Sequence, residues 1–96
     1  MKLAFSPQAV RDLRRLHDFI SEKNPQAAKR IARSLRLGIA RLRDNPQLGR
    51  RIRQAPDQWA PEEMRDWVTG DYVARYLSLQ DTIVVLRIWH GRENRF

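Results

Sequence analysis

The sequence predicts an α+β fold of the order βααβββ, in which a helical hairpin packs on a small, mainly antiparallel sheet. Three features of the 96-residue chain lead to this prediction. Two stretches with helical periodicity follow each other almost without a loop, three strand-like stretches end the chain, and a short strand precedes the first helix. A chain of this length is expected to form one domain over residues 1–96, with a single core.

The first expected strand covers residues 2–5, and a helix is expected to follow over residues 7–23. Ser6 and Pro7 mark the helix start, because a serine side chain caps free helical N–H groups and proline fits the first turn. Apolar residues then recur at three- and four-residue spacing, which defines one inward stripe. The members of this stripe are Val10, Leu13, Leu16 or His17, and Ile20.

Asn24-Pro25 repeats the cap-plus-proline signal, so a second helix should begin at once. It is expected to end near Arg43, because the residue before Pro46 is pushed out of the helical region. Its inward face should comprise Ala28, Ile31, Ala32, Leu35, Ile39 and Leu42, and its outward basic row Lys29, Arg33, Arg36 and Arg43.

Residues 46–61 are rich in proline and polar groups and predict a packed loop, anchored by Leu48, Ile52 and Trp59. Strands are expected over residues 64–68, 72–79 and 82–89, with a tight turn at Gly70, since glycine accepts a positive φ. The last strand is apolar at almost every position, which is typical of a central strand. The first strand should lie beside it.

The chain is strongly basic, with a formal charge of +8 to which arginine contributes far more than lysine. The planar guanidinium favours phosphate and carboxylate groups, so the expected partner is an anionic polymer or an acidic protein segment. A solvated basic surface without a partner is an equally open alternative.

Several classes of site are excluded by composition. The absence of cysteine rules out disulfides, thiolate nucleophiles and cysteine zinc sites. Neither His17 nor His90 stands beside an acidic pair at metal-ligand spacing, so no metal and no cofactor are expected. No apolar stretch approaches the roughly 20 residues that span a bilayer, and the N-terminus lacks an apolar signal core, so a cytoplasmic protein is expected.

His90, Gly91 and Arg92, at the end of the last strand, raise the question of catalysis. Metal-free RNA cleavage needs a base, a cation at the phosphate and an acid for the leaving oxygen. His90, Arg92 and Arg87 would supply the first two, but no residue nearby offers the acid. A histidine at a strand end more often hydrogen-bonds a backbone group, so no catalytic residue is expected.

Arg65, Arg75 and Arg87 occupy three successive strands and would form a phosphate or carboxylate cradle if register brings them to one face. The alternative is that each pairs with a surface acid such as Asp66 or Asp71, and this alternative is favoured.

The aromatic residues raise the question of nucleic-acid binding. Tyr72 and Tyr76 share a strand face, and Trp67 and Trp89 are expected on neighbouring strands, an arrangement that can stack on exposed bases. Such residues usually belong to the core, and a basic helix row is a weak signal for DNA contact. Direct nucleic-acid binding is therefore an alternative that the sequence does not favour.

Five segments in order, FSPQAVRDL, NPQAA, RDNPQLGR, RDWVTGDYVARY and IVVLRIWHGREN, resemble the ParE branch of the RelE/ParE toxin superfamily. The resemblance covers nearly the whole chain and implies the same βααβββ arrangement. It also implies a type II toxin, a plasmid-stabilisation and growth-arrest protein, that is neutralised by a ParD-like antitoxin. ParE-like toxins are known for poisoning DNA gyrase, whereas RelE-like relatives cleave mRNA on the ribosome.

The chain departs from the RelE pattern in two places. Val73 follows Tyr72 where the superfamily often has an arginine, and the sequence stops at Phe96 without the late tyrosine of the nucleases. Arg92 fits both a functional arginine of RelE-like enzymes and the HGR ending of ParE-like proteins. The resemblance thus favours a gyrase-binding toxin. Its expected target- or antitoxin-binding residues are Arg65, Arg75, Arg92, Arg95, Arg33 and Arg36. An acidic antitoxin tail would wrap the hairpin and add a strand to an open sheet edge.

Overall fold

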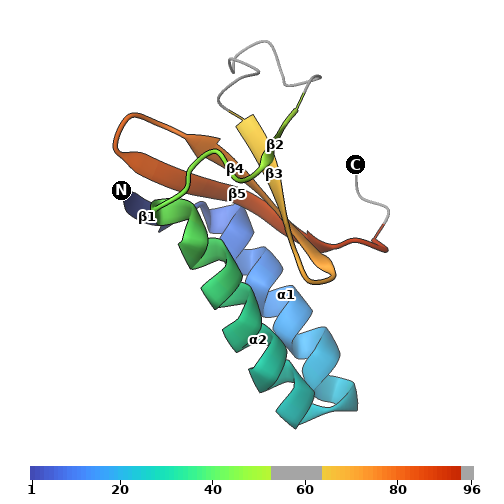
Figure 1. Ribbon diagram of the computed structural model, residues 1–96. Helices are drawn as coiled ribbons and strands as arrows, with labels where there is room; N and C mark the ends of the chain where they lie inside the picture. Colours follow the sequence, from blue (N-terminus) through green and yellow to red (C-terminus); the bar gives the residue numbers. More distant parts are fainter. Residues whose placement is uncertain (53–63, 94–96) are drawn as a thin grey trace.

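The computed structural model describes residues 1–52 and 64–93, and it has the predicted order of elements with one short strand added (Figure 1). The elements are β1 (Lys2–Phe5), α1 (Pro7–Lys23), α2 (Pro25–Ala40), a 3-10 helix (Arg41–Arg43), β2 (Arg50–Arg51), β3 (Met64–Thr69), β4 (Tyr72–Ser78) and β5 (Thr82–His90). The predicted helix starts at Pro7 and Pro25 are confirmed.

The strands form one five-stranded sheet in the order β1-β5-β4-β3-β2. β1 runs parallel to β5, and the other neighbours are antiparallel. The prediction that the first strand lies beside the last is therefore confirmed. Both helices lie on one face of the sheet, and the tip of their hairpin projects well beyond it (Figure 1).

Side-chain caps explain where both helices begin. The Ser6 hydroxyl accepts a hydrogen bond from the Ala9 N–H at 3.0 Å, and the Asn24 side chain accepts one from the Ala27 N–H at 3.1 Å. Asn24 also ends α1, because its backbone N–H donates to the Ile20 carbonyl. One residue therefore joins the two helices without a loop.

The inward face of α1 differs from the prediction at its first turn. Val10 is 47% exposed, whereas Ala9 and Asp12 are buried. The cause is the Ser6 hydroxyl, which also donates to the Leu86 carbonyl of β5 at 2.8 Å and so turns Ala9 toward the sheet. The predicted positions Leu13, Leu16 and Ile20 do face inward.

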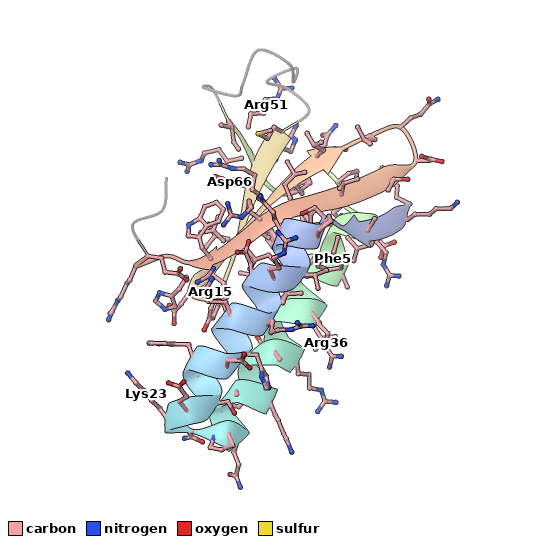
Figure 2. The ribbon with its side chains drawn as sticks, turned by 180° about the vertical axis from the view of Figure 1, so that it is seen from behind. Phe5, Arg15, Lys23, Arg36, Arg51 and Asp66 are labelled. Carbon is pink, nitrogen blue, oxygen red and sulfur yellow. The ribbon has the colours of Figure 1, made fainter. Side chains whose placement is uncertain are left out.

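The second helix agrees with its predicted faces. Ala28, Leu35, Ile39 and the following Leu42 are buried, and the outward residues Lys29, Arg33, Arg36 and Arg43 are exposed. In Figure 2, Arg36 extends from the hairpin away from the sheet. Among the described residues, no helix is long and apolar enough to cross a membrane.

A β-bulge in β5 decides which residues reach the core. Arg75 pairs with Arg87, but the next residue, Tyr76, pairs with Val85, so Leu86 is an extra residue in β5. The bulge moves the inward face from odd to even positions, which buries Ile88 together with Val85. The core between sheet and helices consists of Ala9, Leu16, Leu35, Ile39, Leu42, Ala74, Tyr76, Ile83, Val85 and Ile88.

The segment predicted as a packed loop is not entirely loop. Arg50 and Arg51 form the short edge strand β2 against Asp66 and Arg65 of β3. Leu48 does pack against the core, as predicted. The predicted anchor Trp59 lies outside the described residues. The turn glycine Gly70 has a φ of +61°, which confirms its predicted conformation.

Candidate functional site

The three strand arginines do not converge on one face. Asp66, Arg75 and Arg87 stand opposite one another across β3, β4 and β5. Arg65 instead pairs with Tyr76, one position along, and successive residues of a strand point to opposite faces. At most two of the three arginines therefore share the face on which the cradle was predicted.

Both arginines of that face bind carboxylates. The Nε and Nη2 atoms of Arg75 donate to the two carboxylate oxygens of Asp66 at 2.9 and 3.2 Å. The Arg75 guanidinium also lies 5.2 Å from the ring centre of Trp89, a cation–π contact. The favoured alternative, pairing with a nearby acid, is thus confirmed for Arg75.

Arg87 binds an acid on α1 and not a surface acid of the kind predicted for it. Its Nε and Nη2 atoms donate to the carboxylate of Asp12 on α1 at 2.9 and 3.2 Å. Asp12 is 4% exposed, and it also accepts the Ile88 backbone N–H at 2.9 Å and a hydrogen bond from Arg15. Burial alone raises the pKa of the Asp12 carboxyl, but the hydrogen bonds from Arg87, Ile88 and Arg15 outweigh it, so the net pKa is lowered.

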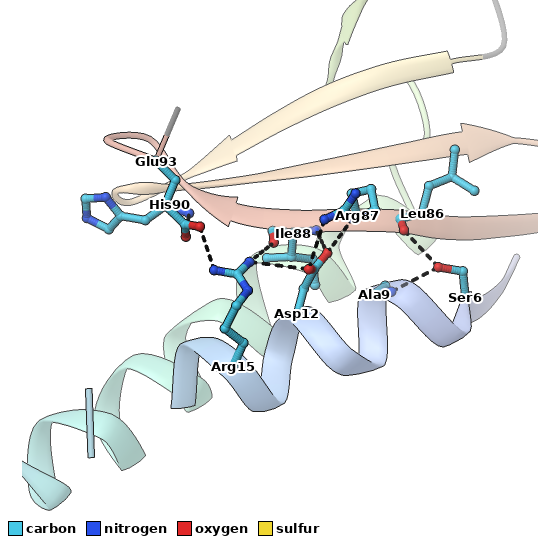
Figure 3. Close-up of polar contacts among 9 residues, drawn as sticks. All are labelled: Ser6, Ala9, Asp12, Arg15, Leu86, Arg87, Ile88, His90 and Glu93. Atoms are coloured by element: carbon cyan, nitrogen blue, oxygen red, sulfur yellow. Dashed lines mark hydrogen bonds and ion pairs between the residues drawn. The ribbon is translucent and has the colours of Figure 1, made fainter. Parts of the chain in front are cut away.

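Polar side chains close the outer edge of β5 where β1 no longer covers it (Figure 3). Ser6 donates to the Leu86 carbonyl, Asp12 accepts from the Ile88 N–H, and Arg15 donates to the Ile88 carbonyl. Glu93 completes the row by accepting the His90 N–H at 2.9 Å. Backbone groups that would otherwise form an open sheet edge therefore have partners.

Glu93 ties the end of the described chain to α1. Its carboxylate accepts a hydrogen bond from Arg15 at 2.5 Å, and its backbone N–H donates to the His90 carbonyl at 2.9 Å. Arg92 lies between His90 and Glu93 in the sequence, so these contacts with α1 also set its position. A charge-assisted hydrogen bond as short as the one between Arg15 and Glu93 is a strong one.

His90 is held by local contacts. Its Nδ1 atom accepts the Arg92 backbone N–H at 3.0 Å, and its ring meets the Tyr72 ring edge-on at a centroid distance of 5.2 Å. The Nδ1 atom is therefore occupied as an acceptor of a backbone hydrogen bond. The predicted backbone-bonding role is confirmed.

Arg65 supports the segment before β2. It donates to the Gly49 carbonyl at 2.7 Å, and the neighbouring Tyr76 hydroxyl donates to the Pro46 carbonyl at 2.7 Å and accepts the Gly49 N–H at 2.9 Å. Tyr76 is fully buried, and burial raises the pKa of its hydroxyl. Arg65 therefore has a structural task in the free protein.

The aromatic residues that were expected on neighbouring strands are separated. β4 lies between Trp67 on β3 and Trp89 on β5. The Trp67 indole donates to the Gly38 carbonyl of α2 at 2.9 Å, whereas Trp89 stacks with Arg75 on the other face. These two rings do not form one stacking platform.

A pocket of about 590 Å³ opens between α1 and the chain segment that follows β5. Leu16, Phe19 and Ile20 form its wall on α1, and Tyr72, His90 and Arg92 face them. The Arg15–Glu93 ion pair lies at its rim. Of the predicted binding residues, Arg92 lines this pocket, Arg33 and Arg36 lie on the exposed side of α2, and Arg95 lies outside the described residues.

A family model for the ParE toxin of the type II toxin-antitoxin system, parDE, matches residues 3–95. The chain belongs to the ParE toxin family. It is also 33% identical over 90 residues to Toxin RelE1 of Caulobacter vibrioides, and the alignment covers 94% of this chain and 92% of that protein. Membership thus defines a type II toxin of the ParE/RelE superfamily.

Solved structures of toxin-antitoxin systems have the same fold. The chromosomal ParDE system from P. aeruginosa matches with a TM-score of 0.75 at 20% identity, covering 94% of this chain and 95% of that one. The RelBE2 toxin-antitoxin complex from Mycobacterium tuberculosis matches with a TM-score of 0.63 at 21% identity, covering 93% and 95%. The predicted fold class is confirmed.

Two features of this ParE-family toxin were missed at the level of sequence, although both left a signal. Asp12 lies three residues after Ala9 and four before Leu16, so an acid interrupts the buried helix face. Phe19 lies three residues after Leu16, beside the predicted stripe, and widens the apolar face beyond what α2 and the sheet cover.

Proposed function

We propose that this protein is the toxin of a type II pair, inhibits DNA gyrase by direct protein binding, and is neutralised by a cognate ParD-like antitoxin. Membership in the ParE family and the segments that resemble its ParE branch support the gyrase target. The charge of +8 supports an acidic antitoxin as the resting partner, because opposite charge speeds encounter and selects the partner.

The strand arginines Arg75 and Arg87 are already bound to carboxylates. This observation favours a toxin that acts by protein binding over one that acts by catalysis. Arg75 and Arg87 each make two hydrogen bonds to a carboxylate, so neither presents an unpaired guanidinium to a phosphate. The imidazole of His90 has its Nδ1 atom engaged. A nuclease would need a base and a cation that are ready to act.

We expect the purified toxin to inhibit DNA supercoiling by gyrase, and an equimolar amount of antitoxin to restore it. The measurement is a supercoiling assay on relaxed plasmid over a range of toxin concentrations. Cleaved plasmid that accumulates in the same reactions would identify trapped gyrase. Unchanged supercoiling at saturating toxin would rule out gyrase as the target.

A ribosome-dependent ribonuclease is the second candidate. It is favoured by the 33% identity to Toxin RelE1 and by the proximity of His90 and Arg92 at one pocket. In that case mRNA cleavage during translation would be visible by toe-printing and would disappear in Arg92→Ala. If the toxin instead acts on gyrase, transcripts should stay intact during growth arrest with both the wild-type and the variant toxin.

A further inference from the structure

We propose that the outer side of α2 binds the phosphate backbone of duplex DNA, without regard to base sequence, through Lys29, Arg30, Arg33 and Arg36, here called the α2 cation patch. The inference goes beyond the proposed function and does not depend on it, because it concerns the toxin and DNA alone. A basic row on a helix is by itself a weak signal for DNA contact. The charge, the exposure and the surroundings of this patch together point to a phosphate backbone.

The patch concentrates charge of one sign on one side of a helix. Lys29 and Arg33 are four residues apart, and Arg30, Arg33 and Arg36 follow one another at intervals of three, so the four side chains are neighbours on the helix surface. α2 has no aspartate or glutamate between Pro25 and Ala40. Like charges at this spacing repel one another and destabilise an isolated helix. A bound polyanion would remove this repulsion.

The cations of the patch are not neutralised by their surroundings. All four residues are exposed, and within residues 1–52 and 64–93 their side chains have no hydrogen-bond or ion-pair partner. The outer side of α1 differs, because the exposed Arg11 and Arg14 share it with the exposed acids Asp18 and Glu22. Opposite charges one helical turn apart reduce the field of α1. The strongest positive field of the hairpin therefore lies over α2.

The shape and chemistry of the patch favour a duplex over a single strand. The hairpin projects beyond the sheet, and Arg36 extends from it away from the sheet, so an extended duplex can approach α2 from outside (Figures 1 and 2). α2 has no aromatic residue, and therefore no ring on which an unstacked base could stack. Three of the four cations are arginine, whose planar fork binds phosphate oxygens two at a time. Phosphate contacts carry no sequence information, so binding should be independent of base sequence.

A phosphate backbone also fits this surface better than an acidic protein segment does. Interfaces between proteins have an apolar core inside a polar rim. Leu37 is the one large apolar side chain of α2 that is exposed, at 64%. Interfaces between proteins and DNA are more polar and much more positively charged on the protein side. The outer side of α2 has this second composition.

The test measures binding of the full-length toxin alone to a fluorescein-labelled duplex of about 20 base pairs, by fluorescence anisotropy over a series of salt concentrations. Each phosphate contact contributes about −0.9 to the slope of log K against log salt, so four contacts predict a slope of about −3.6. The double variant Arg33→Gln/Arg36→Gln should have a slope of about −1.8 and bind at least about 10-fold more weakly at low salt. Two duplexes of different base sequence should bind the wild-type toxin equally.

A second double variant matches the change of charge. Arg11→Gln/Arg14→Gln removes two positive charges from α1 and should keep the wild-type slope, because its positions lie outside the patch. Arg33→Lys/Arg36→Lys retains the charge and should also keep the slope, since the release of counterions depends on charge. Circular dichroism of all three variants establishes that each is folded.

Four results would overturn the proposal. The first is that the wild-type toxin does not bind the duplex at low salt. The second is an equal loss in the α1 and α2 glutamine variants, which would show that the net charge alone attracts DNA. The third is tighter binding of single-stranded RNA of the same length, lost in the α2 variant, which would assign the patch to RNA. The fourth is unchanged DNA binding with weakened antitoxin binding in that variant, which would assign the patch to the antitoxin. Gyrase takes no part in these measurements, so each result leaves the proposed target to its own test.

Discussion

Asp12→Ala is expected to lower the free energy of unfolding by about 3 kcal/mol. The substitution leaves the Arg87 guanidinium without its carboxylate and the buried Ile88 N–H without an acceptor. Breaking one partner of a buried pair generally costs about 3–5 kcal/mol, and the lower end applies because the Arg87 side chain is 25% exposed and can regain water. For a small domain this is a large share of total stability.

Chemical denaturation of the purified variants measures this effect. Asp18→Ala is the matched control, because Asp18 lies on the same helix with a side chain that is 69% exposed, and it should change stability by less than about 0.5 kcal/mol. Adding Arg87→Met to Asp12→Ala should recover part of the loss, since it removes the cation that has lost the Asp12 carboxylate. Equal stability of Asp12→Ala and Asp18→Ala would show that the ion pair contributes nothing.

The same carboxylate predicts a dependence on acid. The folded-state pKa of Asp12 lies below its ordinary value of 3.8. A depressed pKa contributes stability that is present above the unfolded pKa and is lost as pH falls through the folded pKa. The stability difference between wild type and Asp12→Asn should therefore be largest near neutral pH and shrink below pH 3.8.

Local signals made the helical hairpin predictable. The caps at Ser6 and Asn24 act within three residues, and Gly70 acts within one turn, so each is readable without the rest of the fold. The edge strand β2 was missed because two residues, Arg50–Arg51, are too short to show any period. It exists because Arg50 and Arg51 pair with Asp66 and Arg65 of β3, which is tertiary context.

Most of the candidate site could not be predicted from the sequence, because it depends on contacts between residues that are far apart along the chain. The partners Asp12 and Arg87 are 75 residues apart and meet only because β1 stops at Phe5 and leaves the edge of β5 to α1. The face of Arg65 relative to Arg75 depends on how β3 and β4 align, and a shift of one residue reverses it. The periodicity of a single strand predicts neither the contact between Asp12 and Arg87 nor the relative faces of Arg65 and Arg75.

Gly49→Ala is expected to lower the free energy of unfolding by about 2–3 kcal/mol, in the upper part of the range for overpacking. A Cβ atom at position 49 would lie 2.7 Å from Cε1 and 2.8 Å from the hydroxyl oxygen of Tyr76, and 2.9 Å from the Asp66 carbonyl oxygen. Neither obstacle can give way cheaply, because Tyr76 is fully buried and the Asp66 oxygen belongs to a paired strand. The shift would also strain the bonds from Tyr76 and Arg65 to the Gly49 backbone.

Gly91→Ala provides the control in the same denaturation experiment. Its Cβ atom would meet only the Asp71 carbonyl oxygen at 3.3 Å, at an exposed position, so its cost should be within about 0.5 kcal/mol. Tyr76→Phe separates the two parts of the Gly49 effect, since it keeps the ring and removes the hydroxyl that bonds Pro46 and Gly49. That variant should lose about 1–3 kcal/mol through the unpaired backbone groups alone. Equal stability of Gly49→Ala and Gly91→Ala would show that the close packing of Gly49 on Tyr76 does not hold the segment before β2 in place.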